Sequence, residues 1–144
     1  SNATLPVNIE CCNKMGAEPE ISSFVLPLGA TINMDGTAIY QCVAAIFLAK
    51  CIGVDLTMGQ MVTIVVTATL ASIGTAGTSG AGMIMLAMVL DAVGIDPTYI
   101  GLIYGVDRLF DMGRTSLNVI GDASCAICVN YWEGNAKKAA AKKA

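Results

Sequence analysis

Two long stretches that are almost free of charge restrict what this chain can fold into. Residues 21–49 contain one charged side chain, Asp35, and residues 56–90 contain none. A helix needs about 20 apolar residues to cross a bilayer, so both stretches are long enough. Only 13% of all residues are charged, whereas soluble domains average about 25%. The pattern predicts an all-α membrane protein.

The composition also argues against several classes of function. A net charge of −3 and the lack of histidine argue against nucleic-acid binding and against a histidine metal site. Cys125 and Cys128 form a CxxC pattern, but they lie within an apolar run, so we interpret them as packing residues. No cofactor motif and no nucleophile–base pair is evident, which argues against an enzyme.

A stripe of polar side chains interrupts the third apolar stretch, residues 99–129. Its members are spaced by four, three, four and four residues, which confines them to a sector of about 80° on one helical face. Buried charges persist only where they pair with each other, with ions or with a charged solute. The stripe consists of Asp107, Asp111, Arg114, Asn118 and Asp122.

Residues 20–52 have the length of a transmembrane helix, with helix-weakening residues near the middle. Gly29, Asn33 and Asp35 follow Pro27 in this segment, and such residues free backbone carbonyls. Discontinuous helices are a known device of transporters at ion sites. We therefore expect a broken transmembrane helix. The alternative is a kinked helix in which Asp35 pairs with a neighbour.

Residues 57–95 are divided by a glycine-rich segment, residues 74–82. Each flank would form about 22–27 Å of helix, which barely reaches across a hydrocarbon core of about 30 Å. We therefore expect a re-entrant helical hairpin. Nucleotide binding is a poor alternative, because neither GxGxxG nor GxxxxGK[ST] is present.

The ends of the chain suggest its orientation. We expect a transmembrane helix over residues 97–132, ending at Trp132, followed by a basic tail over residues 133–144. By the positive-inside rule that tail is cytoplasmic. Residues 1–3 resemble an expression-tag remnant, which carries no information about the fold. We expect the chain to be a piece of a longer protein.

Three motifs in this order closely resemble the dicarboxylate/amino acid:cation symporter family, which includes the glutamate transporters. The resemblance covers residues 4–130. It implies the C-terminal part of a larger inverted-repeat transporter, with residues 4–16 as the end of a first re-entrant hairpin. The motifs are Asn33-Met34-Asp35-Gly36-Thr37, then Ser72-Ile73-Gly74-Thr75-Ala76-Gly77, then Asp111-Met112-Gly113-Arg114-Thr115 with Asn118-Val119-Ile120-Gly121-Asp122.

The resemblance implies sodium ions as the coupling ions and assigns their ligands. Hard oxygen ligands from carboxylates, amides and unwound backbone suit such a cation. One site uses the side chains of Asp122 and Asn118 with backbone carbonyls, and a second uses two residues of the first motif. A third site uses backbone carbonyls only. The implied ligands are Gly29, Asn33, Asn118 and Asp122 for the first, Asn33 and Asp35 for the second, and Thr31, Ser72, Ile73 and Thr75 for the third.

The same resemblance implies an acidic amino acid as the solute. Arg114 offers a planar fork that matches a carboxylate, and Asp111 would hold the amino group. Alternatively, Asp111 and Arg114 form only a structural salt bridge, with Asp107 as support. Thr78 places a hydroxyl where acidic amino acid transporters usually have an apolar side chain. The implied solute contacts are Thr37, Thr78, Gly80, Asp111, Arg114, Thr115 and Asn118.

The sequence therefore predicts the core of a secondary active symporter that moves glutamate or aspartate with sodium. We expect a multi-pass protein of the cell (inner) membrane, in contact with lipid and homotrimeric when complete. An alternative within the class is a proton-coupled or C4-dicarboxylate carrier. An alternative of another class is a non-transport helical membrane or partner-binding module. We expect no nucleic-acid partner.

Overall fold

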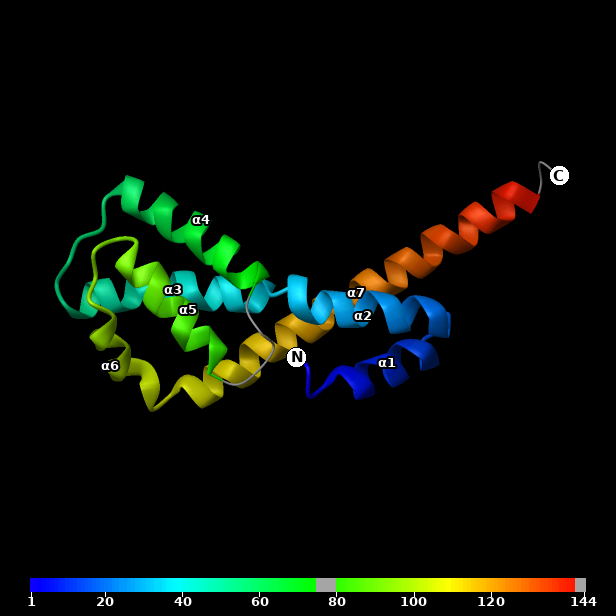
Figure 1. The fold of residues 1–144 in the computed structure, drawn as a ribbon, viewed down its shortest axis with the longest axis horizontal. Coiled ribbons are helices and arrows are strands. Elements are labelled where there is room, and N and C mark those ends of the chain that lie inside the picture. Colours follow the sequence, from blue (N-terminus) through cyan, green and yellow to red (C-terminus); the bar gives the residue numbers. More distant parts are fainter. Residues whose placement is uncertain (75–79, 142–144) are drawn as a thin grey trace.

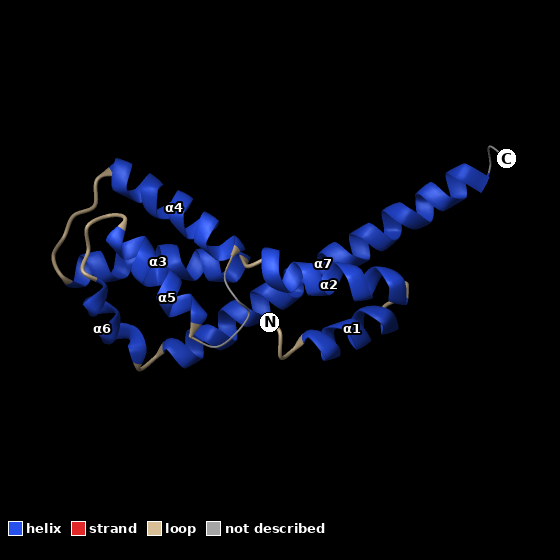
Figure 2. Cartoon of the chain, viewed as in Figure 1, coloured by secondary structure: helices blue, strands red, loops and turns tan. Residues whose placement is uncertain are grey.

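The computed structural model describes residues 1–74 and 80–141, with side chains described as far as residue 137. The described part of the chain contains helices and no strand, which confirms the all-α prediction (Figure 2). The elements are α1 (Leu5–Lys14), α2 (Pro19–Ile32), α3 (Asp35–Cys51), α4 (Met58–Ile73), α5 (Ala81–Asp91), the 3₁₀ helix η1 (Pro97–Ile100), α6 (Gly101–Tyr104) and α7 (Asp107–Ala141).

Helix α7 is the longest element, and α1, α2 and α3 pack against it (Figure 1). Helices α2 and α3 pack along it one after the other, and α1 packs on α2 and α7. Helices α4 and α5 pack on each other and on α3. The C-terminal end of α7 extends beyond the other helices (Figure 1). This arrangement brings the α2–α3 junction against the N-terminal half of α7.

The junction between α2 and α3 is a short non-helical break. Asn33 and Met34 have ψ values of 79° and 47°, outside the helical range. A helix that starts here leaves backbone N–H groups without partners in its first turn. The N–H of Gly36 donates to Oδ1 of Asn118 on α7 at 2.8 Å. A side chain of the polar stripe thus provides a hydrogen-bond acceptor for a free N–H group in the first turn of α3.

One run among the described helices, Pro19–Cys51, which spans this break, is long and apolar enough to cross a membrane. The apolar helices α4 and α5 are shorter. Helix α4 begins with a capping box, in which Gln60 N–H donates to Thr57 Oγ1 at 3.3 Å and Thr57 N–H donates to Gln60 Oε1 at 3.0 Å. Residues 75–79, between α4 and α5, lie outside the described residues.

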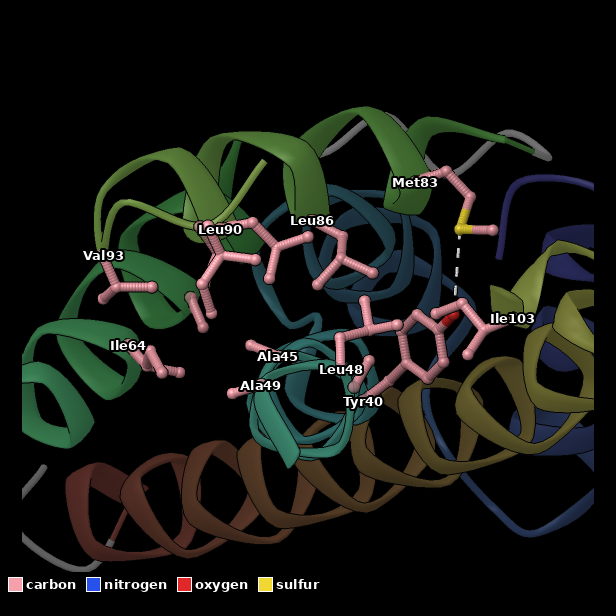
Figure 3. Close-up of a cluster of buried hydrophobic side chains, with 14 residues drawn as sticks. Tyr40, Ala45, Leu48, Ala49, Ile64, Met83, Leu86, Leu90, Val93 and Ile103 are labelled. Carbon is pink, nitrogen blue, oxygen red and sulfur yellow. Dashed lines mark hydrogen bonds between the residues drawn. The ribbon is translucent and has the colours of Figure 1, made fainter. Parts of the chain in front are cut away.

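Two apolar clusters hold these helices together. The larger one joins α3, α4 and α5, and its largest side chains include Leu48, Ile64, Leu86 and Leu90, all fully buried (Figure 3). A smaller cluster joins α1, α2 and α7, and contains Cys12, Ala17, Leu26 and Ala126. The burial of these apolar side chains is the main stabilising contribution to the packing of the helices.

The segment expected as one helix over residues 97–132 is divided in the structure. Asp96 begins η1 by accepting from the N–H of Thr98 at 2.8 Å. This backbone hydrogen bond lowers the pKa of Asp96 below its usual value. Helix α6 begins at Gly101 and is followed by Gly105. Because glycine disfavours the helix, α7 begins only at Asp107. It continues past Trp132 to Ala141.

The turn between α1 and α2 is attached to the far end of α7. Oδ1 of Asn130 accepts from the N–H of Glu18 at 2.9 Å, and its Nδ2 donates to the carbonyl of Gly16 at 3.3 Å. Gly16 has a φ of +99°, which favours glycine. Lys137 donates to Glu18 at 2.8 Å, and this bond raises the pKa of Lys137. These contacts align α2 antiparallel to α7.

Replacement of Gly36 by alanine will destabilise the α3–α7 contact. A Cβ built at Gly36 would lie 2.5 Å from the carbonyl oxygen of Arg114 and 3.0 Å from its Cα. Backbone atoms cannot rotate away, so the two helices must separate, at a cost of about 1–3 kcal/mol. Thermal unfolding of the full-length protein in detergent measures the effect.

The matched control for this prediction is Gly113→Ala. A Cβ built at Gly113 on α7 meets nothing within 4 Å, and alanine favours the helix over glycine. We expect Gly113→Ala to leave the melting temperature unchanged or raised. Equal melting temperatures for the two variants would show that α3 and α7 do not approach as closely as described.

Candidate ion and solute site

Three residues of the polar stripe of α7 are buried and two are half-buried, whereas many large apolar residues of the same helix are exposed. Arg114, Asn118 and Asp122 have exposed fractions of only 6%, 2% and 2%. Leu109 and Ile120, in contrast, are largely exposed. A soluble protein has the opposite distribution. The charged face is therefore the inner face, directed towards α2 and α3.

At one end of the stripe, Arg114 is held by two carboxylates. Its Nη2 and Nε atoms lie 2.8 Å and 3.0 Å from Oδ1 of Asp111, and its Nη1 lies 3.5 Å from Oδ1 of Asp107. Cζ of Arg114 lies 4.8 Å from the ring centroid of Tyr40 on α3, a cation–π geometry. The guanidinium is thus fixed on several sides, and its orientation is set before any solute arrives.

Tyr40 is a site residue that sequence reasoning missed. Its hydroxyl donates to Oδ1 of Asp107 at 3.1 Å, and Sδ of Met83 on α5 lies 3.7 Å from the hydroxyl oxygen (Figure 3). One sequence signal could have indicated it: Tyr40 is the one tyrosine within residues 21–49. A phenol buried in such an apolar segment needs a polar partner for its hydroxyl. Its partner Asp107 contacts both Tyr40 and Arg114, which is compatible with the supporting role that we expected as an alternative.

The Nη1 atom of Arg114 has no hydrogen-bond partner among the described residues. Its 3.5 Å separation from Asp107 makes an ion pair without a hydrogen bond. An unsatisfied donor on a buried guanidinium is uncommon and calls for an explanation. Both hydrogens of Nη1 are therefore available for an added acceptor.

At the other end of the stripe, Asp122 faces the C-terminal part of α2. Its Oδ1 accepts from Nδ2 of Asn33 at 3.0 Å, and a Cβ built at Gly29 would lie 2.5 Å from the same oxygen. A Cβ at Gly121 would lie 2.6 Å from Nδ2 of Asn33 and 3.8 Å from Oδ2 of Asp35. The structure therefore gathers four of the predicted sodium ligands: Gly29, Asn33, Asp35 and Asp122.

Asn118 lies between the two ends and contacts the break directly. Its Oδ1 accepts from the N–H of Gly36. Its Nδ2 lies 3.4 Å from Oγ1 of Thr37 and 3.3 Å from Sδ of Met34. An amide oxygen has two lone pairs, so Oδ1 retains one for a cation after accepting from Gly36. Asn118 and Thr37, both predicted solute contacts, are thus brought together.

Other predicted residues are not joined to these groups. Thr31 is exposed and donates to the carbonyl of Pro27 at 3.3 Å, and Ser72 is buried but donates to the carbonyl of Thr69 at 2.8 Å. In the described ranges, no hydrogen bond joins either of them or the exposed Ile73 to Asp122. Thr115 is half-buried and Gly80, with a φ of +87°, precedes α5. Thr75 and Thr78 lie outside the described residues.

Comparison with known proteins identifies the class to which this helical core belongs. A model of the sodium:dicarboxylate symporter family matches residues 1–132. The chain belongs to the sodium:dicarboxylate symporter family, which confirms the resemblance found in the three motifs. As a member of a transporter family it is part of a membrane protein and is not an enzyme.

Individual relatives are similar over most of the chain. Excitatory amino acid transporter 3 of Mus musculus is 53% identical over 124 residues, and that of Homo sapiens is 51% identical over 124 residues. Each alignment covers 85% of this chain and 24% of the relative. An excitatory amino acid transporter of Caenorhabditis elegans is 50% identical over 133 residues, covering 92% of this chain and 26% of the relative. The chain thus spans about a quarter of the length of these relatives.

Proposed function

We propose that this chain is the C-terminal core of a secondary active symporter that moves glutamate or aspartate together with sodium ions. One observation carries the proposal. A buried guanidinium, Arg114, and a buried carboxylate, Asp122, lie on the same face of α7, against a break between α2 and α3. The names of the relatives, excitatory amino acid transporters, support the choice of solute.

The Arg114 end suits an acidic amino acid because the solute can replace an internal ion pair. Arg114 and Asp111 are paired at 2.8 Å. A solute with a side-chain carboxylate and an ammonium group brings both matching charges, so neither partner is left alone when the pair opens. The carboxylate would meet the fork of Arg114, the ammonium would meet Asp111, and Thr115, Asn118 and Thr37 would contact the rest of the solute. Gly80 and Thr78 would supply further solute contacts.

The Asp122 end suits a hard monovalent cation. The site would combine the carboxylate of Asp122 with the amide oxygen of Asn118 and with the carbonyls of Gly29 and Asn33, all oxygen ligands. The contacts of Asp122 with Asn33 and Gly29 support this set. The C-terminal end of α2 also points its partial negative charge towards this place. Further sodium ions would use Asp35 with Asn33, and the carbonyls of Thr31, Ser72, Ile73 and Thr75.

Coupling between the two ends would pass through the break. Asn118 contacts Gly36 and Thr37 just after the break, while Asn33 within the break contacts Asp122. An ion that orders the break therefore favours the same conformation that the solute needs, which is positive coupling. Helices α4 and α5, acting as a re-entrant hairpin, would close over both.

The remaining features of the proposal concern the whole protein. We place the turn at residues 91–96 outside and the C-terminal end of α7 in the cytoplasm, in agreement with its lysines. Segments outside this chain would supply the rest of the solute site and the scaffold. The complete transporter would cross the cell membrane several times, in contact with lipid, as a homotrimer.

Uptake by the full-length transporter in liposomes tests this function. Radiolabelled aspartate is supplied with an inward sodium gradient, with choline in place of sodium, and with excess unlabelled glutamate, serine or succinate. We expect uptake only with sodium, and strong competition by glutamate alone among the three. Sodium-independent uptake would contradict the ion sites, and competition by succinate equal to that by glutamate would indicate a dicarboxylate carrier.

A further inference from the structure

Gly82 in the first turn of α5 lies directly against the guanidinium of Arg114. A Cβ built at Gly82 would lie 2.7 Å from Nη1, 2.9 Å from Cζ and 3.1 Å from Nη2. Two of these distances are shorter than any normal carbon contact, and all three concern the planar fork itself. Gly82 is the position at which α5 meets the fork.

The backbone of α5 does not require glycine at this position. Gly80 has a φ of +87°, a conformation that favours glycine. Gly82, in contrast, lies inside α5 with no positive φ, and within a helix alanine is preferred over glycine. The reason for glycine at residue 82 is therefore the space that its missing side chain leaves for Arg114.

The fork has little freedom to move aside. The ring of Tyr40 lies 4.8 Å from Cζ, and Asp111 and Asp107 hold the nitrogens. The first turn of α5 is also held in place, because Sδ of Met83 contacts the Tyr40 hydroxyl at 3.7 Å. A methyl group at residue 82 must therefore displace either the fork or α5.

We propose that Gly82 is a positioning residue for the binding of acidic solutes, because it provides the space in which Arg114 presents its fork. This inference rests on the proposed function, in which the fork binds the side-chain carboxylate of the solute. A side chain at residue 82 would misplace that fork, so the affinity for aspartate and glutamate would fall. The sodium ligands around Asp122, held by Asn33 on α2, would be unaffected.

Kinetics of the full-length transporter in liposomes test the proposal with Gly82→Ala. We expect the KM for aspartate at saturating sodium to rise at least tenfold. The half-saturating sodium concentration, measured at saturating aspartate so that coupling does not shift it, should change less than twofold. Gly113→Ala, next to Arg114 but with an unobstructed Cβ position, is the matched control, and we expect its aspartate KM to stay within twofold of the parent. An unchanged aspartate KM in Gly82→Ala would overturn the inference.

A thermal-unfolding cycle tests whether Gly82 acts through Arg114. In detergent, Gly82→Ala should lower the melting temperature when Arg114 is present. In the Arg114→Ala background the obstacle is absent, so the same change should leave the melting temperature equal or higher. An equal decrease in both backgrounds would overturn the inference, because the methyl group would then clash with something other than the guanidinium.

A comparison of Arg114→Ala with Gly82→Ala separates the proposed function from the proposed role of Gly82. If this variant raises the KM for aspartate but Gly82→Ala does not, the solute site stands and the role of Gly82 is wrong. If Arg114→Ala leaves the KM unchanged, the assigned solute site and the role of Gly82 are both wrong.

Discussion

Arg114→Ala will raise the KM of the full-length transporter for aspartate by roughly 30- to 4,000-fold. Loss of one partner of a buried, hydrogen-bonded charge pair costs about 2–5 kcal/mol, and each 1.4 kcal/mol is about tenfold in affinity. Arg114 belongs at the upper part of that range, because it is 6% exposed and hydrogen-bonded through Nε and Nη2. Initial rates of radiolabelled aspartate uptake at saturating sodium provide the measurement.

Arg108→Ala is the matched control for this prediction. Arg108 lies on the same helix and has the same charge, but its side chain is exposed. We expect its aspartate KM to remain within about twofold of the parent, the range of a solvated surface charge. Arg114→Lys should not restore affinity, because an ammonium lacks the planar fork. Equal effects of the two alanine variants would mean that only the net charge matters.

Asp122→Asn will raise the half-saturating sodium concentration of uptake by about 100-fold or more. The change removes the charge and keeps the shape, and the remaining Oδ1 can still accept from Asn33 Nδ2, which lies 3.0 Å away. A buried ion that loses its counter-charge forfeits about 3–5 kcal/mol, which corresponds to this loss of affinity. The sodium dependence of aspartate uptake in liposomes measures it.

Two controls accompany Asp122→Asn. Asp91→Asn removes one carboxylate from the exposed end of α5, and we expect the same sodium dependence as in the parent. The melting temperature of Asp122→Asn in sodium-free detergent should match that of the parent, which shows that the fold is retained. A parent-like sodium dependence of Asp122→Asn would remove Asp122 from the ion site.

Much of the site could be predicted because, in a helix, the spacing of residues along the sequence determines which way their side chains point. The four-, three-, four- and four-residue intervals from Asp107 to Asp122 set one face whatever the surroundings are, and in the structure that face is directed inward. The low charge of residues 56–90 likewise restricts the chain to apolar helices. Local sequence patterns suffice for such features, since they depend on neighbours within one helix.

Other features depend on contacts between helices that sequence spacing does not record. The division of residues 97–132 at α6 was missed, because the apolar pattern continues through Gly101 and Gly105. Tyr40 was missed because its polar partner, Asp107, is 67 residues away in the chain. Gly82 was missed because a glycine in an apolar helix gives no sign of the side chain that it accommodates.

The sequence by itself determined that this chain is an apolar helical protein with one inward face of charge, and its motifs identified the family. Only the tertiary structure decided how that charge is divided, because pairing depends on which helices meet. It placed Arg114 between Tyr40 and Gly82, and Asp122 against Gly29. Those contacts arise where α2, α3 and α5 meet α7, and the stripe alone cannot specify them.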